Sequence, residues 1–211
     1  GGPEGTKVEI QVGRQGEPEP VELDVFRGNV DVPSVASQLT PGGIGYMRIS
    51  RFRDNTGGQV FSALESLNQF QILALILDLR TNPGGSSEAA GEVAGQFLPA
   101  GSLFRSVEGR DGVRADELIV EDANRLDLDG VLMVVLVNEQ TVGEAEAVAG
   151  ALQDAGRAFV VGVETFGEGS DYSFVELSDS SAMYLPTSRW YTPSGQWLGG
   201  GGIAPDLVVV S

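Results

Sequence analysis

Cysteine and histidine are both absent from the 211-residue sequence. Their absence excludes disulfides, Ser–His–Asp triads, Cys–His dyads and metal sites built on thiolate or imidazole ligands. Lysine is almost absent, because Lys7 is the only one beside twelve arginines. A serine–lysine dyad therefore cannot form in the main part of the chain.

Basic residues and long apolar runs are also scarce. The chain has 13 basic and 30 acidic residues, a net charge of −17. Nucleic acids and anionic membranes are disfavoured as partners, because both need clustered Lys and Arg. Such a surface would favour cations or basic peptides, although a soluble, self-repelling surface is the simpler interpretation. No apolar run reaches the ~18 residues needed to span a bilayer, so no membrane insertion is expected within this chain.

Apolar residues recur with the periods of strands and helices in alternation. Near-continuous apolar runs predict three buried parallel strands over 72–79, 131–137 and 158–163. Helical stripes predict helices over 59–70, 88–98 and 141–155. Shorter strands are expected over 45–49, 102–107 and 110–120, with a hairpin from 174–177 and 182–190. The order of elements predicts an α/β core with right-handed crossovers.

The first 41 residues show a different pattern of polar and apolar residues. Polar and apolar residues alternate over 7–12 and 21–26 around a turn, which predicts a β-hairpin within residues 1–28. Residues 29–41 are expected to be an extended connector, in which Pro33 excludes a regular helix. The α/β core is assigned to residues 42–211. Residues 1–5 contain no signal peptide and read as a cut within a longer protein.

Two glycine-containing turns stand between predicted strands and helices. Asn82-Pro83-Gly84-Gly85 can present backbone N–H groups to a ligand beside a helix N-terminus, although a tight turn alone would also require glycine. Thr141-Val142-Gly143-Glu144 has the spacing of a capping box, with Thr141 as the expected N-cap.

These turns lie in two of three segments, over 77–85, 137–154 and 165–170, that resemble the C-terminal processing peptidases, or tail-specific proteases. The endings Tyr191-Thr192-Pro193-Ser194-Gly195 and Gly202-Ile203-Ala204-Pro205-Asp206 also match, so the resemblance covers about residues 42–208. It implies a crotonase-like α/β core that carries a Ser/Lys dyad. It also implies an extracytoplasmic location and likens the N-terminal hairpin to the closing strands of a PDZ domain.

The resemblance assigns roles to individual positions. The family carries a run of Ser-Ala-Ser-Ala-Ser-Glu, whose middle serine is the nucleophile, and Gly143 takes that place here. Glu168 stands where the family has its catalytic lysine, and Tyr172 where it has a supporting glutamine. The interval from Gly143 to Glu168 is 168 − 143 = 25 residues without a gap, the family's usual spacing. Gly84 and Gly85 match the loop that supplies an oxyanion-hole amide, and Glu144 adjoins it.

The resemblance therefore implies a catalytically inactive homologue that binds a polypeptide tail or a partner through the former active-site cleft. Two alternatives stay open: a hydrolase in which Glu168, with a pKa raised by burial, acts on a water, and a small-ligand carrier like the retinoid-binding modules of similar fold. No cofactor and no metal are expected. Several carboxylates could instead converge on Ca²⁺, namely Glu139, Glu144, Glu164, Glu168 and Asp171, but so acidic a chain forms such clusters by chance.

Overall fold

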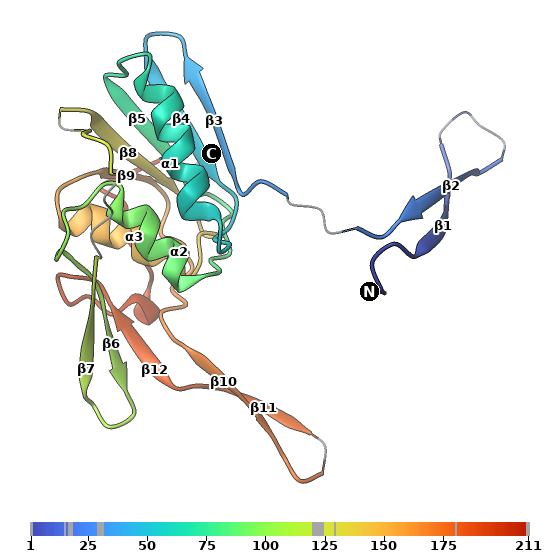
Figure 1. Ribbon diagram of the computed structural model, residues 1–211. Coiled ribbons are helices and arrows are strands. Elements are labelled where there is room, and N and C mark those ends of the chain that lie inside the picture. The colour runs from blue at the N-terminus through green and yellow to red at the C-terminus, as the bar shows by residue number, and fades with distance from the viewer. Residues whose placement is uncertain are drawn as a thin grey trace. The chain divides into compact units, whose positions relative to one another are not determined.

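The computed structural model describes residues 2–14, 16, 19–28, 32–119, 125–128, 130–179 and 181–209. The chain forms two compact units, Gly1–Val32 and Pro33–Ser211. Figure 1 shows the strands and helices of each unit.

The first unit is the predicted hairpin. Strands β1 (Lys7–Val12) and β2 (Val21–Phe26) pair antiparallel, with Lys7 opposite Phe26 and Val12 opposite Val21. Lys7 forms ion pairs with Glu9 and Asp24, each at 2.9 Å. Phe26 is 67% exposed. Two strands alone bury little apolar surface, so a hairpin of this size is marginally stable by itself.

The second unit is built on a six-stranded sheet with the order β13-β9-β8-β5-β4-β3. All neighbouring strands are parallel except β3 and β4, which are antiparallel. The strands are β3 (Val35–Thr40), β4 (Ile44–Ile49), β5 (Ala74–Asp78), β8 (Leu132–Val137), β9 (Phe159–Gly162) and β13 (Leu207–Val208). The central strands confirm the three buried runs predicted from the sequence.

Three helices connect the parallel strands: α1 (Thr56–Asn68), α2 (Ser87–Gly95) and α3 (Glu144–Asp154). The order β4, β5, β8, β9 runs one way across the sheet, so right-handed crossovers place all three helices on the same face (Figure 1). Alternate strand residues fill the space beneath them, among them Met47, Ile49, Leu75, Leu77, Val135 and Val137. Burying each such side chain contributes about 1.5–3 kcal/mol.

The remaining strands form two smaller sheets. One has the order β12-β6-β7, and the other is the hairpin of β10 and β11. Their bounds are β6 (Leu103–Gly109), β7 (Arg114–Leu118), β10 (Tyr172–Glu176), β11 (Ala182–Pro186) and β12 (Ser188–Tyr191), and a 3₁₀ turn, η1, covers Leu198–Gly200. The end of the predicted strand over 110–120, Val120, lies outside the described residues.

The strands differ from the sequence prediction in two main respects. Val35–Thr40, inside the expected connector over 29–41, forms β3, so the sheet begins before residue 42. As an edge strand it exposes most of its side chains, which explains its polar sequence. The single strand expected over 182–190 is divided after Pro186, which has no N–H to continue the ladder, and β12 then pairs with β6. Residues 29–31 lie outside the described residues.

Within the described ranges, no helix combines the length and apolarity that a membrane crossing requires.

Candidate functional site

The two glycine-containing turns meet at the carboxyl ends of β5 and β8. Open α/β sheets usually bind ligands at this edge. Val142 N donates to Asn82 O at 2.9 Å, which joins the turns directly. The buried Asn82 side chain donates to Ile49 O at 3.0 Å and accepts from Gly84 N at 2.9 Å. The Asn82-Pro83-Gly84-Gly85 loop is therefore held against its neighbours by its own side chain.

Gly143 forms the sharp turn between β8 and α3. It is the N-cap of α3, with φ 59° and ψ −118°. A residue with a side chain adopts such a backbone only at a cost of about 1–3 kcal/mol. A Cβ placed on Gly143 would lie 3.0 Å from Glu168 Oε2. The structure thus brings the two positions together, although 25 residues separate them in the sequence.

Glu168 is half-buried and lies in the extended segment that follows β9. Burial raises the pKa of its carboxyl group, and the neighbouring charges of Glu144 and Glu146 raise it further. Three carboxyl groups therefore face one small region at the start of α3.

Glu146 organises this region, and the sequence analysis assigned it no role. Its side chain is fully buried and accepts four hydrogen bonds. Oε2 accepts from Gly143 N at 2.8 Å and from Glu168 N at 3.0 Å. Oε1 accepts from Gly167 N at 2.6 Å and from Thr165 Oγ1 at 2.5 Å. The Glu146 carboxylate thus holds the backbone at Gly143 and at Glu168, the two positions that face each other.

The Glu144 carboxylate accepts a hydrogen bond from a backbone amide of the glycine loop. Its Oε2 accepts from Gly85 N at 2.9 Å, and its Oε1 accepts from Ser87 Oγ at 2.9 Å. Gly85 has φ 144°, and a Cβ there would collide with the carbonyl group of Phe52, so the turn itself requires glycine. The N–H expected to serve an oxyanion hole is therefore bonded to a carboxylate of the same chain.

Comparison with known proteins relates this arrangement to a family. The family model described as Peptidase family S41 matches residues 43–209. The chain belongs to the S41 peptidases. It is 34% identical to a carboxy-terminal-processing protease of Bartonella bacilliformis and 36% identical to the corresponding protease of a Synechocystis species, and each match covers 99% of the chain. Homology to C-terminal processing serine proteases is thus established, as the sequence predicted.

A solved structure agrees with this assignment. The photosystem II D1 C-terminal processing protease superposes with a TM-score of 0.73 at 30% identity, over 99% of this chain and 56% of that one. The chain covers 48% of each of the two curated relatives, so it spans about half their length. The S41 fold, with its mixed α/β sheets, is confirmed, whereas the crotonase-like and PDZ-like details stay predictions.

The predicted capping box at Thr141 is wrong. Thr141 is buried, its Oγ1 donates to Leu79 O at 2.9 Å, and it accepts from Asn138 N at 3.0 Å. The helix begins two residues later because Gly143 makes the turn. Glu146, not Glu144, then lies three residues beyond the N-cap and bonds to its amide.

Other residues singled out from the sequence lie in different surroundings. Tyr172 stacks on Tyr184 across the β10–β11 hairpin, with ring centroids 4.8 Å apart. Asp171 accepts from Trp190 Nε1 at 3.0 Å and from Ser188 Oγ. Glu139 and Glu164 are exposed. Among the described residues, no group of three or more acidic side chains could hold a metal ion, which leaves the calcium alternative without a site there.

The S41 core also has a cavity of about 790 Å³ where β8 and β9 begin. Leu128, Met133 and Phe159 contribute apolar surface to it, beside Gln153 and Arg157. Because the strands are parallel, this is the edge of the sheet opposite to Gly143. The cavity is therefore separate from the region of Gly143, Glu144 and Glu168.

Proposed function

We propose that the chain is a catalytically inactive S41 homologue that binds a polypeptide segment or a protein partner through the former active-site cleft. The relatives' names describe processing at the carboxyl end of a polypeptide, and a polypeptide is accordingly the expected ligand here. A sharp turn between a strand and a helix is where other hydrolases hold their nucleophile. Gly143 occupies such a turn without a side chain that could attack a carbonyl carbon.

The hydrogen bond from Gly85 N to Glu144 Oε2 is the observation that carries this proposal. An oxyanion hole stabilises a transition state only when its N–H donors are free to bond the developing negative oxygen. Here a carboxylate already accepts the Gly85 proton, and its charge would repel an oxyanion. In the family run, alanine takes the position of Glu144, so the substitution supports a conversion from catalysis to binding.

Three hydroxyl groups of this region, those of Thr141, Thr165 and Ser87, are engaged in hydrogen bonds of the fold. Thr141 Oγ1 donates to Leu79 O, and Thr165 Oγ1 donates to Glu146. Ser87 Oγ donates to Glu144. Each proton is therefore donated to an acceptor other than the Glu168 carboxyl group.

A second function, water-based hydrolysis, is favoured by one observation only. The raised pKa of Glu168 brings its carboxyl group closer to the range of a general base. In that case Glu168→Gln would abolish a measurable cleavage activity. In an inactive homologue the same variant leaves an unchanged, background level of cleavage.

The main proposal is tested by rebuilding the site in the full chain. The variant Gly143→Ser/Glu144→Ala/Glu168→Lys restores the family residues at these three positions and releases Gly85 N. We expect it to cleave denatured casein, whereas the parent chain does not. The matched control Gly143→Ser/Glu168→Lys keeps the Glu144 carboxylate on Gly85 N, and we expect it to be roughly a hundredfold slower, as for loss of one oxyanion donor. Equal activity of the two variants would contradict the role given to Glu144.

Three finer features are part of the same proposal. We infer a crotonase-like core, a PDZ-derived hairpin over 1–28 and an extracytoplasmic location from the family resemblance. Fractionation of cells that produce the natural protein would test the location, because recovery with the cytoplasmic fraction alone would contradict it.

A further inference from the structure

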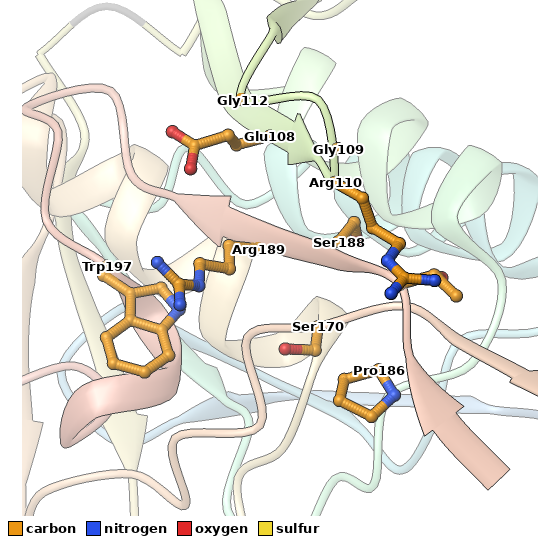
Figure 2. A pocket seen from close by; sticks show the side chains of 10 residues that line it. Glu108, Gly109, Arg110, Gly112, Ser170, Pro186, Ser188, Arg189 and Trp197 are labelled. Carbon is orange, nitrogen blue, oxygen red and sulfur yellow. The ribbon is translucent and has the colours of Figure 1, made fainter.

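A pocket of about 490 Å³ lies on the three-stranded sheet, apart from the Gly143 turn. The turn between β6 and β7, strand β12 and the residues around Ser170 and Trp197 form its walls. Figure 2 shows Arg189 beside Trp197 and Arg110 on the other side, with Ser170 between them in this view. The volume is typical of ligand-binding pockets.

The charge of this pocket is opposite to that of the chain as a whole. The net charge is −17, yet two guanidinium groups, of Arg110 and Arg189, line the pocket. Its one lining carboxylate, Glu108, is already paired with Arg114 at 2.9 Å. Among the described residues, neither Arg110 nor Arg189 has a carboxylate within 4.0 Å.

Nearby acidic groups accept hydrogen bonds from donors other than the two arginines, and Glu108, which stands opposite Arg189 across the β12–β6 pair, is bonded to Arg114. Asp171 accepts hydrogen bonds from Ser188 Oγ and Trp190 Nε1, and Asp111 accepts from Val113 N at 3.0 Å. The Arg189 guanidinium lies 5.2 Å from the ring centre of Trp197. A planar guanidinium held against an aromatic ring keeps its N–H donors available to a further ligand. The pocket therefore offers two guanidinium groups that form no direct ion pair among the described residues.

One wall of the pocket is close in sequence to the former active site. Ser170 follows Glu168 by two residues, and Trp190 N donates to Gly169 O at 2.9 Å, which aligns this segment with β12. An extended chain advances about 3.3–3.6 Å per residue, so two residues span roughly 7 Å. A bound polypeptide that runs alongside residues 168–170 would therefore reach the pocket within two or three of its own residues.

We propose that the pocket binds an acidic side chain, Asp or Glu, of the polypeptide bound in the former cleft, through Arg110 and Arg189. This inference rests on the proposed function. A carboxylate matches the paired N–H donors of a guanidinium group, and such charge-assisted bonds are stronger than neutral ones. The same two residues would disfavour a basic side chain at that position, so they would select the sequence of the bound segment in spite of the acidic surface elsewhere.

The test uses two short, unstructured peptides rich in alanine and serine, one carrying Glu at every third position and the other Gln. Binding to the full chain is measured by isothermal titration calorimetry. We expect the Glu peptide to bind about tenfold more tightly than the Gln peptide. In Arg110→Gln/Arg189→Gln this preference disappears. The control Arg14→Gln/Arg48→Gln removes the same charge from exposed positions outside the pocket and keeps the preference.

Each other outcome overturns the pocket proposal in a recognisable way. Equal binding of both peptides to the parent chain contradicts it but leaves polypeptide binding intact. A preference that survives loss of both pocket arginines places the acidic site elsewhere. If denatured casein binds but neither peptide does, the pocket proposal alone fails. If casein and both peptides all fail to bind, the proposed function fails as well.

Discussion

Replacing Glu146 by alanine tests how Gly143 and Glu168 are held opposite each other. The buried carboxylate accepts hydrogen bonds from Gly143 N, Glu168 N, Gly167 N and Thr165 Oγ1. A hydrogen bond to a charged group contributes about 1.5–3 kcal/mol, and four would sum to roughly 6–12 kcal/mol if they were additive. They are not independent, and water can enter the space that the side chain leaves. Because single substitutions seldom exceed 4–5 kcal/mol, we expect a loss of about 4 kcal/mol in the free energy of unfolding.

Urea unfolding followed by tryptophan fluorescence measures this loss, since Trp190 is buried in the core. The milder Glu146→Gln keeps one oxygen as an acceptor and turns its amide group toward two of the four donors, so a loss of about 2–3 kcal/mol is expected. Glu164→Ala, at an exposed acidic position, is the matched control and should change stability by less than about 0.5 kcal/mol. A loss below about 1 kcal/mol for Glu146→Ala would refute the role given to this carboxylate.

Three further predictions concern single side chains. Because burial raises the pKa of Glu168, wild-type stability falls as pH rises above the ordinary value of 4.5, so the stability of Glu168→Gln relative to wild type should increase as pH rises above 4.5 in urea titrations; a constant difference would contradict this. Arg105 is 3% exposed and lies 4.0 Å from the ring centre of Trp190, so Arg105→Ala should lower the unfolding free energy by about 2 kcal/mol through lost packing and cation–π contact, and a loss under about 0.5 kcal/mol would be inconsistent with it. Tyr184→Ala removes the stack on Tyr172 and should speed amide exchange in β10 and β11 by roughly fivefold, about 1 kcal/mol, without a matching loss of global stability.

The sequence predicted the elements whose signal is strong and local. Runs such as 72–79 and 131–137 are apolar enough to predict strands of the central sheet, and they form β5 and β8, although Leu73 and Leu132 near their N-terminal ends are exposed. β3 was not predicted because its sequence is polar. As an edge strand it is stabilised by backbone pairing with β4 and does not require an apolar face. The division of 182–190 depends on which strand each half pairs with, and sequence periodicity carries no information on pairing partners.

The site was predictable only in part. The resemblance pointed to Gly143 and Glu168, but their interval of 25 residues says nothing of distance in space. The contacts of Glu144 and Glu146 join segments that fold together only through the sheet, so periodicity could not reveal them. One local signal was available for Glu146, namely its position three residues after a turn-forming glycine at a helix start.

The central claim is that the fold has lost its catalytic groups while it keeps the ability to bind a polypeptide. The most direct measurement incubates the purified full chain with denatured casein, follows both cleavage and binding, and repeats both with Glu168→Gln. We predict binding without cleavage for both proteins. Cleavage by the parent chain that persists through repeated purification and disappears in Glu168→Gln would contradict the claim and establish an active hydrolase.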